Sequence, residues 1–225
     1  GDRRSVLRAA VTRYPRLALP ILGGTVIVFA LMAAHLVFSA PAAIIVDRQD
    51  WLGHFGVFPP SLWGALRFAL RDVFARVTND RYMPFLWTMQ TEMVGSLLVF
   101  ALLLGYGRLR RPALWIGILA LALLAARSPL CCFMLGLLLG QARSAGIFDK
   151  ARTRLGPIVI GLAVAALYAL VCFTQLDPKP GSYLNMILAG ASLALIYASA
   201  GLTDFFGQNP FSKFLGLISF PLYLV

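Results

Sequence analysis

Apolar runs separated by short polar turns set the hydropathy pattern of this 225-residue chain. A helix rises about 1.5 Å per residue, so a run of about 20 apolar residues crosses a hydrocarbon core about 30 Å thick. Runs of that length predict four full membrane spans and an incomplete last one, at 17–39, 84–106, 156–175, 183–202 and 214–225. Two shorter runs, 112–126 and 129–142, are predicted to form a tight hairpin hinged at Arg127-Ser128-Pro129, with a single broken helix as the alternative. The predicted fold is therefore all-α: a polytopic integral membrane helix bundle with about six full spans plus a truncated last span.

Composition supports this prediction, because 60% of the residues are hydrophobic and 13% are charged. A soluble domain is nearer to about 45–50% apolar and about 25% charged. No long stretch has ordinary globular composition, so we predict one transmembrane domain over residues 1–225, embedded in the lipid bilayer of the cell membrane. The net charge of +11 is assigned to arginines at the cytoplasmic ends of spans. Nucleic-acid binding is not expected, because basic and aromatic residues do not interleave along the chain.

The distribution of Lys and Arg predicts the orientation. With the N-terminus in the cytoplasm, the turns on the cytoplasmic side hold more Lys and Arg than the turns outside. Residues 40–83 then form an extracytoplasmic loop. Within it, residues 61–77 are predicted to form an amphipathic helix capped by Ser61, which lies at the membrane interface or dips in as a lid. Its predicted apolar side is Leu62, Leu66, Ala69, Leu70, Val73 and Phe74, and its predicted polar side is Arg67, Arg71, Asp72 and Arg76.

Polar residues occupy the first half of the predicted span 84–106. On a helix, neighbours on one face recur every three or four residues, which groups Thr88, Thr91, Glu92, Gly95 and Ser96. Met93, Val94, Leu97 and Phe100 lie largely away from that face. A carboxylate at membrane depth costs about 2.5–3.5 kcal/mol, so the polar face is predicted to point into protein or a wet cavity. Glu92 is therefore the candidate catalytic residue, and the alternative is a structural acid that pairs with an arginine or a backbone donor.

Five arginines precede the first predicted span, namely Arg3, Arg4, Arg8, Arg13 and Arg16. They are typical of a positive-inside anchor. They also suit a cytoplasmic site for a phosphorylated cofactor, because the guanidinium fork matches phosphate oxygens. Pro20, near the start of the span, is compatible with the first turn of a helix.

The cysteines and histidines do not predict a metal site. Cys131, Cys132 and Cys172 all lie inside apolar runs, where thiols are usually small core residues. Neither His35 nor His54 stands at metal-ligand spacing from them. We therefore expect no metal, and the histidines are not candidates for catalysis.

Four stretches of the sequence carry a resemblance to one known family. Residues 86–93, LWTMQTEM, and residues 214–225, FLGLISFPLYLV, resemble the LW(S/T)…E and FLG-x-I-S-(Y/F)-x-LYL-x-H signatures of the membrane-bound acyltransferase 3 family. Residues 13–16, RYPR, followed by Pro20, are similar to the family's RxxR motif at the cytoplasmic start of a span. Residues 133–136, FMLG, are similar to its FxxG segment. The order and spacing of the four fit, and the resemblance covers nearly the whole chain.

The resemblance implies a polytopic enzyme that takes an acyl group, often acetyl, from acyl-CoA (acetyl-CoA) at the cytoplasmic side. The acyl group goes to a hydroxyl of a carbohydrate or similar acceptor, as in the O-acetylation of glycans. By the same resemblance, Arg13 and Arg16 lie near the acyl-CoA entrance, and Glu92 lies on the helix that faces the central cavity.

The chain also departs from the family pattern. The family's catalytic histidine belongs to a first helix that this sequence does not contain, and its signature histidine would follow Val225. We therefore expect a partial chain that lacks the N-terminal helices and the C-terminal end and is inactive alone. Acyl transfer needs a general base, and the residues present leave its identity open.

Two other classes of function compete with the acyltransferase hypothesis. A transporter or flippase module would use Glu92 as a proton or substrate site, and broken helices in paired repeats would favour it. No convincing internal repeat is visible in the sequence. A structural membrane scaffold is the third hypothesis. The discriminating observation is chemical, because an acyltransferase releases free CoA thiol when acceptor is present and a transporter moves solute without consuming acyl-CoA.

Overall fold

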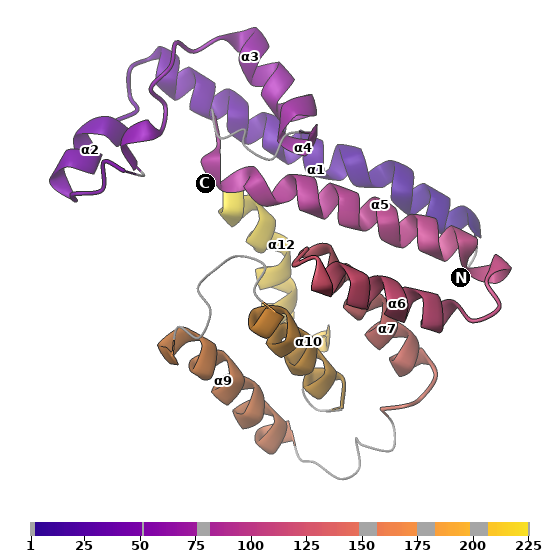
Figure 1. The fold of residues 1–225 in the computed structure, drawn as a ribbon. Coiled ribbons are helices and arrows are strands. Elements are labelled where there is room, and N and C mark those ends of the chain that lie inside the picture. Colours follow the sequence, from indigo (N-terminus) through magenta and orange to yellow (C-terminus); the bar gives the residue numbers. More distant parts are fainter. Residues whose placement is uncertain are drawn as a thin grey trace. The chain divides into compact units, whose positions relative to one another are not determined.

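The computed structural model describes residues 3–50, 52–75, 82–148, 157–174, 183–198 and 207–224. Helices connected by turns account for these residues, and no strand occurs among them, so the all-α prediction is confirmed (Figure 1). The chain divides into two compact units. The first comprises Gly1–Leu97 with Leu217–Val225, and the second comprises Leu98–Gly216.

Helix α1 (Arg3–Ala33) is the longest element, with 31 residues. It begins 14 residues before the predicted span 17–39, because the arginine- and alanine-rich stretch ahead of that span has good helix formers. Pro15 and Pro20 therefore lie inside the helix, and the expectation that Pro20 occupies a first turn is wrong. Arg13 and Arg16 accordingly lie on a continuous helix and not on a separate basic segment.

α1 also ends earlier than predicted, at Ala33, because His35 adopts the left-handed conformation with φ of 57°. The His35 N–H donates to the Met32 carbonyl (3.0 Å), and the Leu36 N–H donates to the Leu31 carbonyl (2.8 Å). This pair of bonds is the Schellman arrangement, in which the left-handed residue is most often glycine. His35 is thus a helix terminator.

Replacing His35 should reveal the cost of this conformation. His35→Gly is expected to stabilise the protein by about 0.5–1 kcal/mol, because glycine adopts positive φ without a steric penalty, although it loses more entropy on folding. His35→Val is expected to destabilise it by about 1–2 kcal/mol, because a β-branched residue is strained there. Thermal unfolding in detergent measures both. Equal midpoints for the two variants would contradict this account of the helix end.

The segment after α1 forms short helices: α2 (Ser39–Ile45), η1 (Leu52–His54), α3 (Leu62–Arg67), the π-helical turn η2 (Phe68–Asp72) and α4 (Val73–Ala75). The last three join into one helix over 62–75, which confirms that the described part of the predicted segment 61–77 is helical. Its cap is confirmed as well, since the Gly64 N–H donates to Ser61 Oγ at 3.3 Å. Residues 76–81, with Arg76, lie outside the described residues.

The helix over 62–75 faces its surroundings differently from the prediction. Leu62 and Leu70 are exposed, whereas Asp72 is buried and forms an ion pair with Arg67 (Nε to Oδ2, 3.4 Å). The π-helical turn at 68–72 has more residues per turn than an α-helix, so it changes the direction of the side chains that follow. A prediction that assumes 3.6 residues per turn therefore places some residues on the wrong face of the helix. The side chains that do face inward include Ala65, Phe68, Ala69 and Val73.

One core holds the first unit together. It joins α1, the helix over 62–75 and the segment leading into α5, through Ile21, Met32, Ala65, Phe68, Ala69, Val73, Tyr82, Met83, Leu86 and Met89. Tyr82 fixes the start of the helix over 62–75, because its hydroxyl accepts from the Ser61 N–H (3.1 Å) and donates to the Ser61 carbonyl (2.8 Å). The helix over 62–75 therefore packs along α1.

The predicted span 84–106 is helical from end to end. It begins as a 3-10 helix, η3 (Pro84–Thr88), continues as α5 (Met89–Gly105) and closes with η4 (Tyr106–Arg108). Among the described residues, Arg3–Ala33 and Pro84–Arg108 are the helices long and apolar enough to cross a membrane. The count of about six spans stays a prediction, because the other apolar helices are shorter.

The second unit contains the predicted hairpin. α6 (Pro112–Ala125) and α7 (Leu130–Ser144) pack against each other around Ile116, Ala120 and Met134 (Figure 1). This confirms the hairpin over a single broken helix. Arg127 ends α6 with φ of 53°, in the same left-handed conformation as His35.

The described residues that follow form the helices α9 (Pro157–Thr174), α10 (Tyr183–Ala198) and α12 (Pro210–Leu224). α9 and α10 lie within the predicted spans 156–175 and 183–202. α12 begins four residues before the predicted start at 214, because Asn209 caps it by accepting from the Phe211 N–H at 2.8 Å. Residues 149–156 and 175–182, which connect these helices, lie outside the described residues.

Candidate functional site

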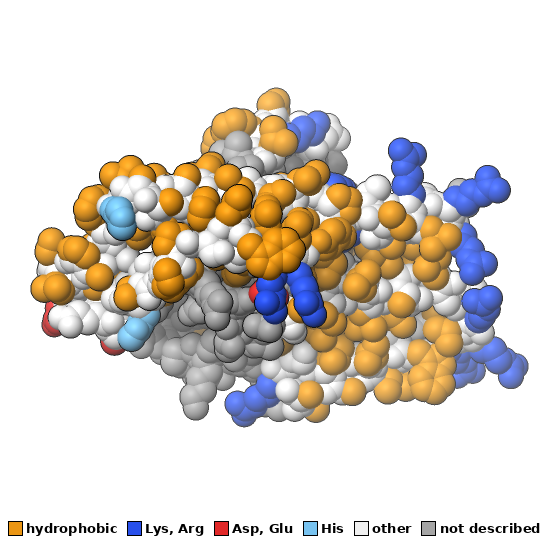
Figure 2. Space-filling view, turned by 90° about the horizontal axis from the view of Figure 1, so that it is seen from above, with side chains coloured by type: hydrophobic (Ala, Val, Ile, Leu, Met, Phe, Trp, Pro, Cys, Tyr) orange, Lys and Arg blue, Asp and Glu red, His pale blue; other side chains and the backbone are white. Residues whose placement is uncertain are grey.

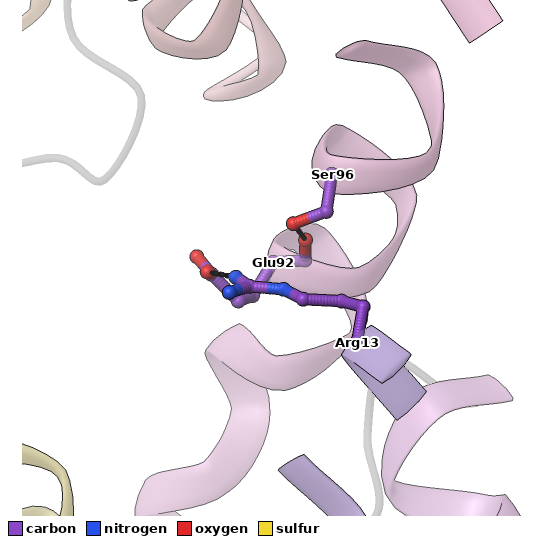
Figure 3. Close-up of polar contacts among 3 residues, drawn as sticks. All are labelled: Arg13, Glu92 and Ser96. Atoms are coloured by element: carbon purple, nitrogen blue, oxygen red, sulfur yellow. Dashed lines mark hydrogen bonds and ion pairs between the residues drawn. The ribbon is translucent and has the colours of Figure 1, made fainter. Parts of the chain in front are cut away.

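The ion pair between Arg13 and Glu92 is the centre of the candidate site. Arg13 Nη2, from α1, donates to Glu92 Oε1, from the first turn of α5 (Figure 3). The two residues are 79 positions apart in the sequence. Their side chains are 29% and 37% exposed, so the pair is neither sealed in a core nor fully solvated. Partly exposed pairs contribute roughly 0–1 kcal/mol, so this one orients the two groups more than it stabilises the fold.

The face of α5 that carries Glu92 is largely the predicted one. Gly95 and Ser96 are buried, and Val94 and Leu97 are exposed. Met93 is buried as well. Ser96 Oγ donates to the Glu92 carbonyl at 2.7 Å, so this hydroxyl serves the helix backbone (Figure 3).

Arg13 retains an unused donor. Its Nε is buried and has no hydrogen-bond partner among the described residues. A buried donor without an acceptor costs about 1–3 kcal/mol. The guanidinium is thus suited to an additional acceptor, and an anionic oxygen is the acceptor that guanidinium groups bind best. A phosphate group meets this requirement.

Arg16 lies three residues along α1 from Arg13, on a neighbouring part of the helix surface. Its side chain is exposed and takes part in none of the ion pairs or side-chain hydrogen bonds found among the described residues. The structure therefore places both predicted arginines on one helix, with Arg13 engaged by Glu92 and Arg16 open to a ligand.

Tyr14 is a residue that sequence reasoning missed. Its hydroxyl donates to the Leu70 carbonyl at 2.5 Å, and its ring lies 5.5 Å from that of Phe74. These contacts join the helix over 62–75 to α1 between Arg13 and Arg16. A lone tyrosine gives no sequence signal for such a contact, because its partners are 56 and 60 residues further along the chain.

No other cluster of side chains in the described part of the chain suggests chemistry. No group of three or more His, Cys, Asp and Glu residues there is placed to hold a metal ion. Cys131 is buried and contacts Met186 (Sγ to Sδ, 3.0 Å), as expected of a core thiol. The side chain of Cys172 lies outside the described residues. His35 ends α1 and His54 lies in η1, apart from the ion pair.

Large apolar side chains are exposed in unusual number. Ile27, Trp63 and Ile158 are 62%, 74% and 77% exposed. Figure 2 shows many hydrophobic side chains on the surface in view. Exposed apolar surface of this extent is typical of contact with lipid or another protein.

Comparisons with known proteins add one finding. The family model described as "Acyltransferase domain", acyltransferase 3, matches residues 1–225, which is the whole chain. No curated protein and no solved structure matches the chain.

Proposed function

The chain belongs to the acyltransferase 3 family of membrane acyltransferases, and we propose that it serves O-acylation with acyl-CoA as donor. The acyl group, with acetyl as the simplest case, goes to a hydroxyl of a carbohydrate or similar acceptor. In that reaction the thioester C–S bond breaks, an ester C–O bond forms, and the proton of the hydroxyl ends on the CoA thiol. The protein lies in the cell membrane with several spans, and the start of this chain lies in the cytoplasm.

The observation that carries the donor assignment is the unsatisfied Nε of Arg13 beside the open Arg16. CoA carries phosphate groups, and two guanidinium groups one helical turn apart suit them by charge and by hydrogen-bond geometry. Arg13 and Arg16 are therefore assigned to the phosphates of acyl-CoA. Glu92 is the candidate proton acceptor for the acceptor hydroxyl, because it is the carboxylate next to them.

The transporter hypothesis gains no support. The family assignment points to group transfer. Solute flux without CoA release would support the transporter hypothesis instead.

The proposal is tested by acyl-CoA turnover. Membranes with the full-length protein and membranes with this 225-residue chain are incubated with acetyl-CoA and a panel of glycan acceptors, and free CoA thiol is measured. Acceptor-dependent release by the full-length protein and none by the shorter chain is the expected result, because the family's catalytic histidine is expected outside these residues. No release by either, with every acceptor class present, would overturn the proposal.

Arg16→Ala in the full-length protein is expected to raise KM for acyl-CoA by roughly 5–30-fold, the loss of about 1–2 kcal/mol of charge-assisted phosphate binding. The protein level should change little, because the Arg16 side chain is exposed. Initial rates against acyl-CoA concentration give KM, and immunoblotting of membranes gives the level. Arg110→Ala, at another exposed arginine, is the matched control. Parallel loss of level and activity in Arg16→Ala would assign Arg16 to folding.

A further inference from the structure

We propose that Glu92 is a displaceable counter-ion, which neutralises Arg13 in the empty enzyme and leaves it when a phosphate of acyl-CoA binds. The inference rests on the proposed function, because it takes acyl-CoA as the donor. It adds a regulation of that site: donor binding and the release of the Glu92 carboxylate become one event.

The first support is the way in which Glu92 is held. Among the described residues, Arg13 is the partner of its carboxylate. The hydrogen bond from Ser96 goes to the Glu92 backbone carbonyl at 2.7 Å, so it anchors the helix and leaves the side chain unrestrained (Figure 3). Loss of the Arg13 contact therefore frees the carboxylate to adopt another rotamer.

The second support is the state of Arg13. One of its nitrogens, Nη2, binds Glu92, while Nε is buried without an acceptor. Nε and Nη2 form one edge of the guanidinium, which binds a phosphate through two parallel hydrogen bonds. A phosphate bound to that edge accepts the hydrogen bond from Nη2, which Glu92 accepts in the empty enzyme. Because both groups are anions, they also repel each other, so phosphate and carboxylate compete for Arg13.

The third support is accessibility. The Arg13 and Glu92 side chains are 29% and 37% exposed, so a ligand can reach the ion pair without unfolding the core, and it meets the buried Nε only once Glu92 has left. Arg16, exposed on the same side of α1, adds a second positive charge that favours the phosphate over the carboxylate. A ligand shifts such an equilibrium by its difference in affinity for the two states, and here it binds only the state in which Arg13 is released.

It follows that the two substrates act in a fixed order, with acyl-CoA binding before the acceptor reacts. In the empty enzyme the carboxylate is occupied, and an acceptor hydroxyl finds no free base at Glu92. After donor binding, the released carboxylate accepts the hydroxyl proton while the hydroxyl oxygen attacks the thioester carbonyl. The C–S bond then breaks, and the proton passes to the CoA thiolate.

The test compares CoA affinity with turnover in the full-length protein purified in detergent, using radiolabelled CoA as the probe. Glu92→Gln is expected to bind CoA about 3–10-fold more tightly than wild type, because the competing charge is removed, while acylation is lost. Asp50→Asn removes one carboxylate of an exposed pair with Arg48 (3.4 Å) and should leave the CoA affinity unchanged. This control separates a local effect from one of net charge.

Each outcome decides between the hypotheses. Unchanged or weaker CoA binding by Glu92→Gln, with wild type binding CoA, overturns the counter-ion proposal and leaves the proposed function intact. Failure of wild type itself to bind CoA overturns both. If Glu92→Gln elutes as an aggregate in size-exclusion chromatography, Glu92→Asp decides. Its shorter carboxylate competes less well, so about 2–3-fold tighter CoA binding is expected, and no tightening contradicts the proposal.

Discussion

Replacement of Arg13 by alanine is expected to lower kcat/KM for acyl-CoA by roughly 10–150-fold. The change removes a charge-assisted hydrogen bond to phosphate, which is worth about 1.5–3 kcal/mol. The change also removes the ion-pair partner of the Glu92 carboxylate. The unpaired carboxylate then repels the phosphate of the donor. Initial rates with acyl-CoA as the varied substrate, on the full-length protein in membranes, measure the effect.

Two variants show whether the guanidinium itself matters. Arg13→Lys keeps the charge but lacks the two-pronged geometry, so a loss intermediate between wild type and Arg13→Ala is expected. Arg8→Ala removes an exposed arginine from the preceding part of α1 and should leave kcat/KM within about twofold, because surface changes away from a site are usually small. Wild-type kinetics in Arg13→Ala would remove this residue from the donor site.

The ion pair also couples the two side chains energetically. Arg13→Ala with Glu92→Gln is expected to bind CoA better than Arg13→Ala alone, because the second change removes the unpaired carboxylate. Non-additivity of this kind is the signature of residues in direct contact. Additive effects on CoA affinity would indicate that the two side chains act separately.

Features that extend over many consecutive residues, such as apolar runs, predicted the fold well. The apolar run 84–106 is helical, because little interrupts its helix propensity and hydropathy. The hairpin 112–142 follows from its prolines, since Pro112 occupies the first turn of α6 and Pro129 precedes α7. Hydropathy reports the apolar part of a helix and not its ends, which is why the first 14 residues of α1 were assigned outside the predicted span.

The errors share a cause, which is that tertiary contacts and rare backbone conformations leave weak local signals. His35 ends α1 in a conformation for which glycine is the usual signal. The π-helical turn at 68–72 buries Asp72 and exposes Leu70, against the even spacing of an ideal helix. For the site, the polar face of α5 was predictable from spacing. The identity of the Arg13 partner was not, because only folding brings residues 13 and 92 together.

Phe68→Ala is expected to cost about 3–5 kcal/mol of stability, the usual range for deleting a buried phenylalanine. Phe68 is 1% exposed, and its ring lies 5.7 Å from that of Tyr82, within the core that joins the helix over 62–75 to α1. The cavity left by the ring removes contacts from both sides of this interface. The midpoint of thermal unfolding in detergent measures the loss, with Trp63→Ala as the control on the same helix, because Trp63 is 74% exposed.

The same variant tests whether the helix over 62–75 supports the site. Tyr14 holds that helix through the Leu70 carbonyl and the Phe74 ring, next to Arg13 in the sequence of α1. If undocking of the helix disturbs this turn of α1, Phe68→Ala should weaken CoA binding at temperatures well below its unfolding midpoint, whereas Trp63→Ala should not. Unchanged CoA affinity in a destabilised Phe68→Ala would instead mean that Phe68 supports the fold alone, and that α1 and α5 position Arg13 without help from this helix.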